Sequence, residues 1–97
     1  MVLEIINNEV QNLLTNKKVI IDFYATWCGP CRIQAPIVEE ASQETTEVVF
    51  AKVDVDQNRE LAISYQITNI PTICYFVDGK LQKKLVGVQS KSTLLNL

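Results

Sequence analysis

Two cysteines lie three positions apart in the segment Trp27-Cys28-Gly29-Pro30-Cys31. A disulfide between them closes a loop of only four residues, which restrains the unfolded chain by about 2 kcal/mol on the chain-entropy model. Such a bond is a poor structural staple, so a bond that opens and closes explains the pair better. The spacing therefore predicts a redox-active Cys28–Cys31 pair and thiol–disulfide exchange.

The segments on either side of the cysteines predict how the pair is held. The run from Val19 to Ala25 is apolar at both odd and even positions, which is typical of a strand buried on both faces. From Arg32 onward the apolar residues follow a helical period. Cys28 is then expected at a helix N-terminus, where free N–H groups and the helix dipole stabilise a thiolate. We therefore predict Cys28 as the nucleophile and Cys31, one turn further on, as the resolving thiol.

Asp22 is the one acid inside the apolar run. Burial of a carboxylate without a partner is costly, so its pKa is expected to rise. Our hypothesis is that Asp22 takes the proton from Cys31 during resolution, directly or through a water. The alternative is that Asp22 forms a buried ion pair with Lys52 that satisfies the carboxylate fully. Both can hold if Lys52 tunes the acid.

The other side chains that could be reactive or bind a metal are expected to have structural or surface roles. A structural zinc site needs four ligands, and the chain has no histidine and only one further cysteine, Cys74, so no metal site is expected. Cys74 lies in an apolar segment and is predicted to be a core residue. Trp27 could belong to the core or to a contact surface, and its neighbours favour a contact surface.

Composition limits the classes of protein to consider. The 97 residues, 47% of them hydrophobic, predict a single domain over residues 1–97. A net charge of -2 gives no basic stripe for nucleic acid, and no apolar run is long enough to span a membrane. No basic segment precedes an apolar one at the N-terminus, so a cytoplasmic location is expected, with the chain as a monomer.

Periodicity and turn residues predict an α/β fold of one central sheet between helices. The sheet is expected to be mixed, with about five strands, a parallel core and an antiparallel C-terminal hairpin turning at Asp78-Gly79. The predicted strands are Val2 to Ile6, Val19 to Ala25, Val48 to Val55, Thr72 to Val77 and Lys80 to Val86. About four helices are expected, after Asn7, after Cys31, after Asn58 and from Ser90 to Leu97. In the second of them, the positions predicted to face the sheet are Ile33, Ala35, Ile37, Val38 and Ala41.

The cysteine motif, preceded by Asp22-Phe23-Tyr24-Ala25 and followed by Pro36, resembles the thioredoxin family. Further segments resemble that family in the same order: Ala51 to Asp56, Ile70-Pro71-Thr72, Asp78-Gly79 and Val86-Gly87. The resemblance implies the thioredoxin fold, with a cis peptide bond before Pro71 and this proline against the cysteine pair. It also implies a substrate groove framed by Trp27, Gly29, Pro30, Ile70, Pro71 and Gly87. Asp22 and Lys52 match the buried acid of the family and its lysine partner.

The function that the resemblance implies is that of a protein-disulfide reductase without a bound cofactor. Reducing equivalents are expected from NADPH through a partner thioredoxin reductase. Expected substrates are enzymes of the ribonucleotide reductase, peroxiredoxin and methionine sulfoxide reductase types. One alternative is a binding module that uses the groove around Trp27, Ile70 and Gly87, with redox chemistry incidental. Another is a disulfide oxidase or isomerase, although Gly-Pro between the cysteines resembles the reducing members.

Overall fold

The computed structural model describes residues 1–97 and contains one five-stranded sheet with the strand order β1-β3-β2-β4-β5. The strands are β1 (Val2–Glu4), β2 (Lys18–Tyr24), β3 (Val49–Asp54), β4 (Thr72–Val77) and β5 (Lys80–Val86). Strands β1 and β2 both pair with β3 in parallel, whereas β4 is antiparallel to β2 and to β5. The predicted mixed sheet with its C-terminal hairpin is confirmed.

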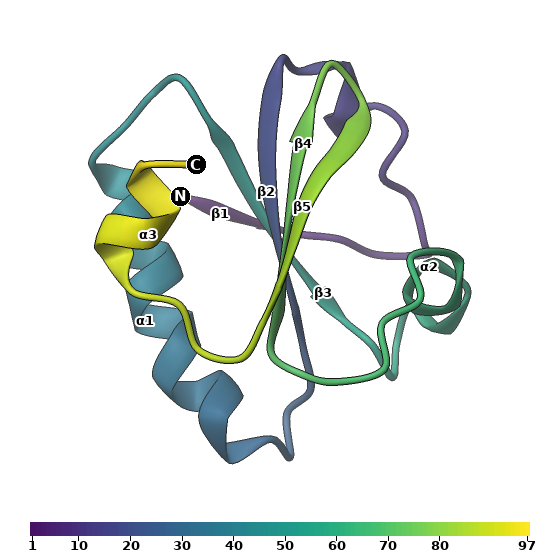
Figure 1. Ribbon diagram of the computed structural model, residues 1–97. Coiled ribbons are helices and arrows are strands. Elements are labelled where there is room, and N and C mark those ends of the chain that lie inside the picture. Colours follow the sequence, from purple (N-terminus) through teal and green to yellow (C-terminus); the bar gives the residue numbers. More distant parts are fainter.

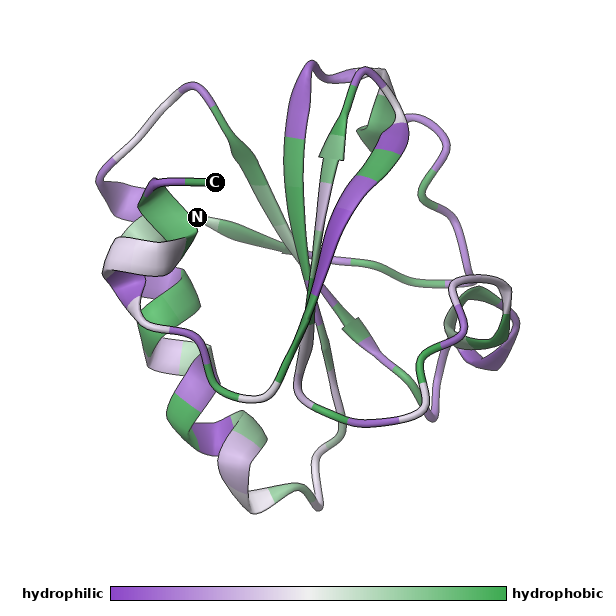
Figure 2. Cartoon of the chain, viewed as in Figure 1, coloured by the Kyte–Doolittle hydropathy of each residue, from purple (hydrophilic) through white to green (hydrophobic).

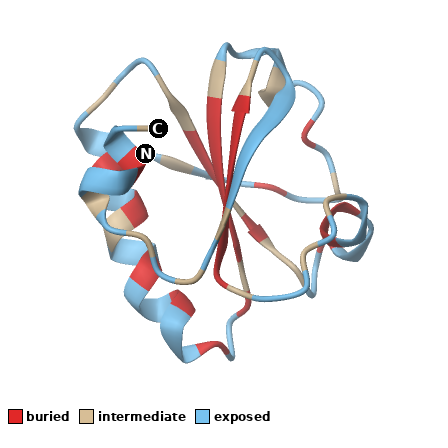
Figure 3. Cartoon of the chain, in the orientation of Figure 1, coloured by how far each residue is buried: buried red, intermediate tan, exposed pale blue.

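Helices cover both faces of this sheet. The helices α1 (Gly29–Gln43) and α3 (Lys91–Leu95) lie on one side, and α2 (Arg59–Ser64) lies on the other (Figure 1). The apolar residues of β2 divide accordingly: Ile20 packs in the cluster with Leu94, and Ile21 packs in the cluster with Leu61. Both faces of the central strands are therefore buried (Figure 3). None of the helices has the length and apolar character needed to cross a bilayer.

The expected number of about four helices is wrong, because the structure has three. The segment after Asn7 forms only a short 3-10 turn at Leu13–Thr15. Asn7 and Asn8 have positive φ values of 54° and 56°, which are incompatible with a continuing α-helix. Asn8 instead accepts a hydrogen bond from the backbone N–H of Leu61 at 2.9 Å and so ties this segment to the start of α2.

The predicted inner face of α1 is partly wrong as well. Ile33 is 60% exposed, and Ala35 is also exposed, whereas Gln34 is completely buried. The side-chain amide of Gln34 donates to the carbonyl of Gln89 at 3.1 Å and accepts from its N–H at 2.6 Å. A polar residue can occupy this inner position because both ends of its amide are paired.

The sheet edge formed by β5 is exposed and largely hydrophilic (Figure 2). Lys80, Lys83 and Lys84 lie there, where charge discourages pairing with another chain. Lys84 also donates to the backbone carbonyls of Tyr65 and Gln66, at 3.0 and 2.6 Å.

Candidate active site

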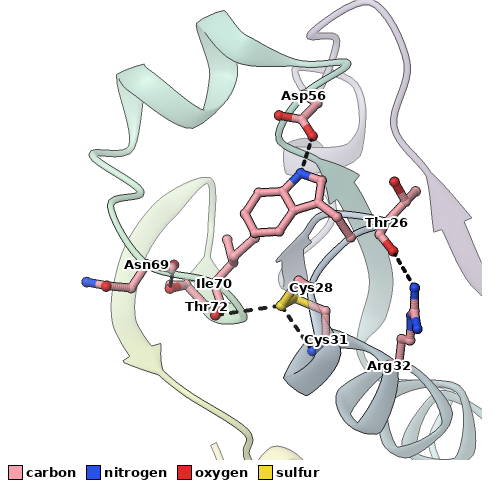
Figure 4. Close-up of a disulfide and its surroundings, with 9 residues drawn as sticks. Thr26, Cys28, Cys31, Arg32, Asp56, Asn69, Ile70 and Thr72 are labelled. Atoms are coloured by element: carbon pink, nitrogen blue, oxygen red, sulfur yellow. Dashed lines mark hydrogen bonds between the residues drawn. A yellow bond between two sulfur atoms is a disulfide. The ribbon is translucent and has the colours of Figure 1, made fainter.

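The two cysteines of the motif form a disulfide at the junction of β2 and α1 (Figure 4). Cys28 is the N-cap residue of α1, and its Sγ accepts a hydrogen bond from the backbone N–H of Cys31 at 3.2 Å. Pro30 lies in the first turn and has no N–H to offer. The sulfur of Cys28 therefore occupies the place of a capping oxygen, where a negative charge is stabilised by the helix N-terminus. This confirms the predicted position of Cys28.

Burial does not distinguish the two thiols. Cys28 is 5% exposed and Cys31 is 3% exposed, and both pack with Ala25 in a small cluster. Tyr24 and Ile70 contact this cluster from its sides. The assignment of Cys28 as the nucleophile therefore depends on its capping position and not on greater exposure.

The loop before β4 lies against the disulfide. The Ile70–Pro71 peptide bond is cis, as the family resemblance implies, and the carbonyl oxygen of Ile70 is 3.9 Å from the Sγ of Cys28 (Figure 4). The N–H of Gly87 donates to the carbonyl of Pro71 at 2.8 Å. Gly87 has a φ of 92°, a backbone conformation that residues other than glycine rarely adopt. The structure thus brings Ile70, Pro71 and Gly87 together beside Cys28.

Trp27 is part of the surface next to the pair. Its side chain is 68% exposed, and its indole Nε1–H donates to Oδ2 of Asp56 at 2.8 Å (Figure 4). Gly29 and Pro30 are exposed beside it. These contacts agree with the contact surface that the sequence favoured. The partnership with Asp56 was not predicted, because nothing local in the sequence links residues 29 positions apart.

Asp22 lies on the face of β2 that α1 covers, and only 3% of its surface is exposed. Its Oδ1 has no hydrogen-bond partner in the protein. Beside it is a cavity of about 70 Å³, which can hold a water molecule. Burial raises the pKa of Asp22 to about 7, while Lys52 acts in the opposite direction. The predicted rise of this pKa is confirmed.

The alternative in which a buried ion pair with Lys52 satisfies Asp22 is wrong. Lys52 is the register partner of Asp22 in β3, but its Nζ lies 3.6 Å from Oε1 of Glu4 and forms no ion pair with Asp22. Its side chain is 43% exposed, so the ammonium remains hydrated instead of following the carboxylate into the interior. Lys52 therefore acts on Asp22 only from a distance.

Cys74 lies apart from the pair. It is fully buried in β4, in the core cluster with Phe23 and Phe76 on the α2 side of the sheet. Burial raises the pKa of its thiol to about 11, and Lys84 lowers it by less. Cys74 is therefore a core residue, as predicted, and its thiol stays protonated. No group of three or more His, Cys, Asp or Glu side chains is arranged to hold a metal ion.

Comparison with known proteins gives consistent results over nearly the whole chain. The thioredoxin family model matches residues 2–97. A thioredoxin from Mycoplasmoides gallisepticum is 51% identical over 87 residues, which are 90% of this chain and 87% of that protein. A bifunctional thioredoxin reductase/thioredoxin from Mycobacterium leprae is 46% identical over 84 residues, which are 86% of this chain but 18% of that protein.

Solved structures show the same similarity in three dimensions. A mutant thioredoxin from Halobacterium salinarum superposes with a TM-score of 0.90 at 36% sequence identity. The superposition covers 97% of this chain and 84% of that one.

Proposed function

This chain belongs to the thioredoxin family and is a thiol–disulfide oxidoreductase, and from that premise we propose how its residues divide the work. Cys28 attacks the disulfide of a protein substrate, and Cys31 then releases the reduced substrate. The observation that carries this assignment is the capping position of Cys28, whose sulfur already accepts the N–H of Cys31 at 3.2 Å. The thiolate of Cys28 gains most from this position because the charge falls at the helix N-terminus.

The reaction transfers two electrons in two exchange steps. First, the Cys28 thiolate attacks one sulfur of the substrate disulfide, so that a mixed disulfide forms and the other substrate sulfur leaves as a thiolate. Second, the Cys31 thiolate attacks the sulfur of Cys28. The Cys28–Cys31 disulfide forms, and the second substrate thiol is released.

Asp22 supplies the base for the second step in this proposal. It accepts the proton of Cys31, directly or through a water in the adjoining cavity. Support comes from its pKa of about 7, which places the carboxylate close to the operating pH. Ala35 lines the same cavity and follows Cys31 by four positions in α1, so the two residues share one face of this helix. Lys52, the only cation that lines this cavity, tunes the acid.

The surface around the disulfide receives the substrate. We assign this role to Trp27, Gly29, Pro30, Ile70, Pro71 and Gly87. The exposure of Trp27 and the closeness of the Ile70 carbonyl to Cys28 support the assignment. An extended substrate segment can lie along this loop and present its disulfide to Cys28.

The oxidised protein must be reduced again before the next cycle. We propose that a thioredoxin reductase supplies the electrons from NADPH, since one relative is named as a fusion of the two proteins. Thioredoxins act without a bound cofactor, so the NADPH site belongs to that partner. We further propose a cytoplasmic monomer whose substrates include enzymes of the ribonucleotide reductase, peroxiredoxin and methionine sulfoxide reductase types.

Reduction of insulin by dithiothreitol tests this function, because the released insulin chains precipitate and turbidity reports the rate. The wild type should accelerate precipitation, whereas Cys28→Ser and Cys31→Ser should reduce it to the uncatalysed rate. Cys74→Ala is the matched control and should behave as the wild type, provided that its unfolding curve shows a folded protein. Equal rates for the wild type and both active-site variants would contradict the catalytic role and favour a binding module.

A further inference from the structure

Three charged residues form a row across the sheet on three neighbouring strands. Glu4 of β1 is the register partner of Lys52 in β3, and Lys52 is the register partner of Asp22 in β2. Side chains at paired positions of neighbouring strands lie on the same face and within reach of one another. Lys52 therefore stands between two carboxylates and can approach either one.

The contacts show that Lys52 is drawn to Glu4. Its Nζ lies 3.6 Å from Oε1 of Glu4 and 5.9 Å from the ring centre of Tyr24, which is itself next to Glu4. The hydroxyl of Tyr24 donates to both carboxylate oxygens of Glu4, at 3.1 and 3.0 Å. Burial, followed by the bond to Glu4, raises the pKa of Tyr24, so this phenol stays protonated and keeps donating. Glu4 is thus fixed by Tyr24 and in turn holds Lys52.

Asp22, at the other end of the row, has no such partner. Its Oδ1 lacks any hydrogen bond, and the cavity beside it is lined by Tyr24, Glu39 and Lys52 among others. The charged or titratable groups that face this region are Glu4 of β1, Tyr24 of β2, Lys52 of β3 and Glu39 of α1. On β4, the register partner of Asp22 is Ile73, which does not titrate. Lys52 is the only cation in this set.

We propose that Glu4 is a positioning residue that holds the ammonium of Lys52 away from Asp22 and thereby keeps this opposite charge from the buried carboxyl group. The mechanistic value of this arrangement rests on the proposed role of Asp22 as the proton acceptor of Cys31. If Lys52 moved to Asp22, the carboxylate would stay ionised to lower pH and become a weaker base. Glu4 is exposed and lies at the edge of the sheet, so it controls the site without touching the cysteines.

Removing the charge of Glu4 acts on Asp22 in two ways that must be separated. Glu4→Gln frees Lys52 to approach Asp22, and it also removes a distant negative charge. Both effects favour the ionised form of Asp22, but only the first needs Lys52. Comparing Glu4→Gln in the wild type with Glu4→Gln in a Lys52→Met background isolates the positioning effect, because the second background has no ammonium to move.

The titration of Asp22 can be followed directly by carbon-13 NMR of its carboxyl group in the oxidised protein. Glu4→Gln should lower the midpoint by about one pH unit, the lower end of what a nearby opposite charge produces. In the Lys52→Met background the same change should leave the midpoint nearly unmoved. Glu47→Gln is the matched control, because Glu47 is an exposed glutamate that does not contact Lys52, and it should have no effect.

Three outcomes would overturn the proposal. These are an unchanged midpoint in Glu4→Gln, an equal shift in Glu47→Gln, and an equal shift with and without Lys52. The pH profile of the resolving step gives a separate readout. When the reduced protein reacts with dithiobis(nitrobenzoate), this step releases the second nitrothiobenzoate, so its rate can be followed by absorbance. A midpoint shift without a change in that profile supports the positioning role of Glu4 and counts against Asp22 as the proton acceptor.

Discussion

Asp22 is a residue whose burial lowers the stability of the fold. In the unfolded chain its carboxyl ionises near pH 3.8, whereas burial raises the pKa to about 7 in the folded protein. Between these values the folded state binds a proton that the unfolded state has lost. The free energy of unfolding therefore falls as pH rises through this window, and the full loss is present above the folded pKa.

Asp22→Asn should remove this loss, because the amide does not ionise. We expect the variant to be more stable than the wild type by about 2 to 4 kcal/mol near pH 8 and about equally stable near pH 4. Urea unfolding of both proteins across this range measures the difference. A constant difference at all pH values would show that the effect comes from packing and not from ionisation.

The same substitution should slow the resolving step. Asparagine cannot accept a proton, so the second release of nitrothiobenzoate should be about tenfold slower near pH 7, below the usual range for loss of a general base because water can substitute. The first release, which depends on Cys28, should change little. Stopped-flow absorbance resolves the two phases. An unchanged second phase throughout the pH range would remove Asp22 from the mechanism.

The sequence predicts the environment of a single side chain only where neighbouring residues in the chain determine it. The burial of Asp22 and its raised pKa could be predicted, because a lone acid in an apolar strand has few ways to be hydrated. The attraction of Lys52 to Glu4 could not be predicted. It follows from the register of β1 against β3, which pairs residues far apart in the chain.

Helix α1 holds the C-terminal segment in part through the side chain of Gln34. Gln34 bonds both the N–H and the carbonyl of Gln89, two residues after Gly87. Gln34→Ala should therefore leave the half-buried N–H and carbonyl of Gln89 without their partner, vacate a fully buried position, and cost about 2 to 3 kcal/mol of stability.

Gln43→Ala in the same helix is the matched control, because Gln43 is exposed and makes only a surface contact with Glu39. It should change the free energy of unfolding by less than about 0.5 kcal/mol. Urea unfolding measures both variants. Equal effects of the two substitutions would contradict a special role for the hydrogen bonds between Gln34 and Gln89.

The predictions of elements succeeded where turn signals bounded a clear period. The bounds of β4 and β5 agree with those predicted from the apolar run and the Asp78-Gly79 turn. The predictions of elements failed where tertiary contacts overrode the local sequence pattern. Asn7 and Asn8 adopt left-handed conformations that end the expected first helix, and Gln34 takes an inner position that hydropathy would assign to an apolar side chain.

The topology gathers the site from segments that are far apart in the chain. The end of β2 delivers the cysteine pair, and the loops around Pro71 and Gly87 approach it from the C-terminal half. The local pattern predicted the cysteine chemistry. It did not predict that the loop at Pro71 approaches the cysteines with a cis peptide bond, because a cis bond before proline is a minority outcome on sequence grounds alone. The resemblance to the thioredoxin family supplied it, and the structure agrees.

In the proposed mechanism Cys28 attacks first and Cys31 resolves, and trapping the mixed disulfide shows which thiol attacks. Reduced Cys31→Ser protein can attack a substrate disulfide but cannot resolve the product. After reaction with insulin, mass spectrometry of the protein and its proteolytic fragments should find one insulin chain joined to Cys28. An adduct on Cys74, or a stable adduct formed equally well by Cys28→Ser through Cys31, would contradict the assignment.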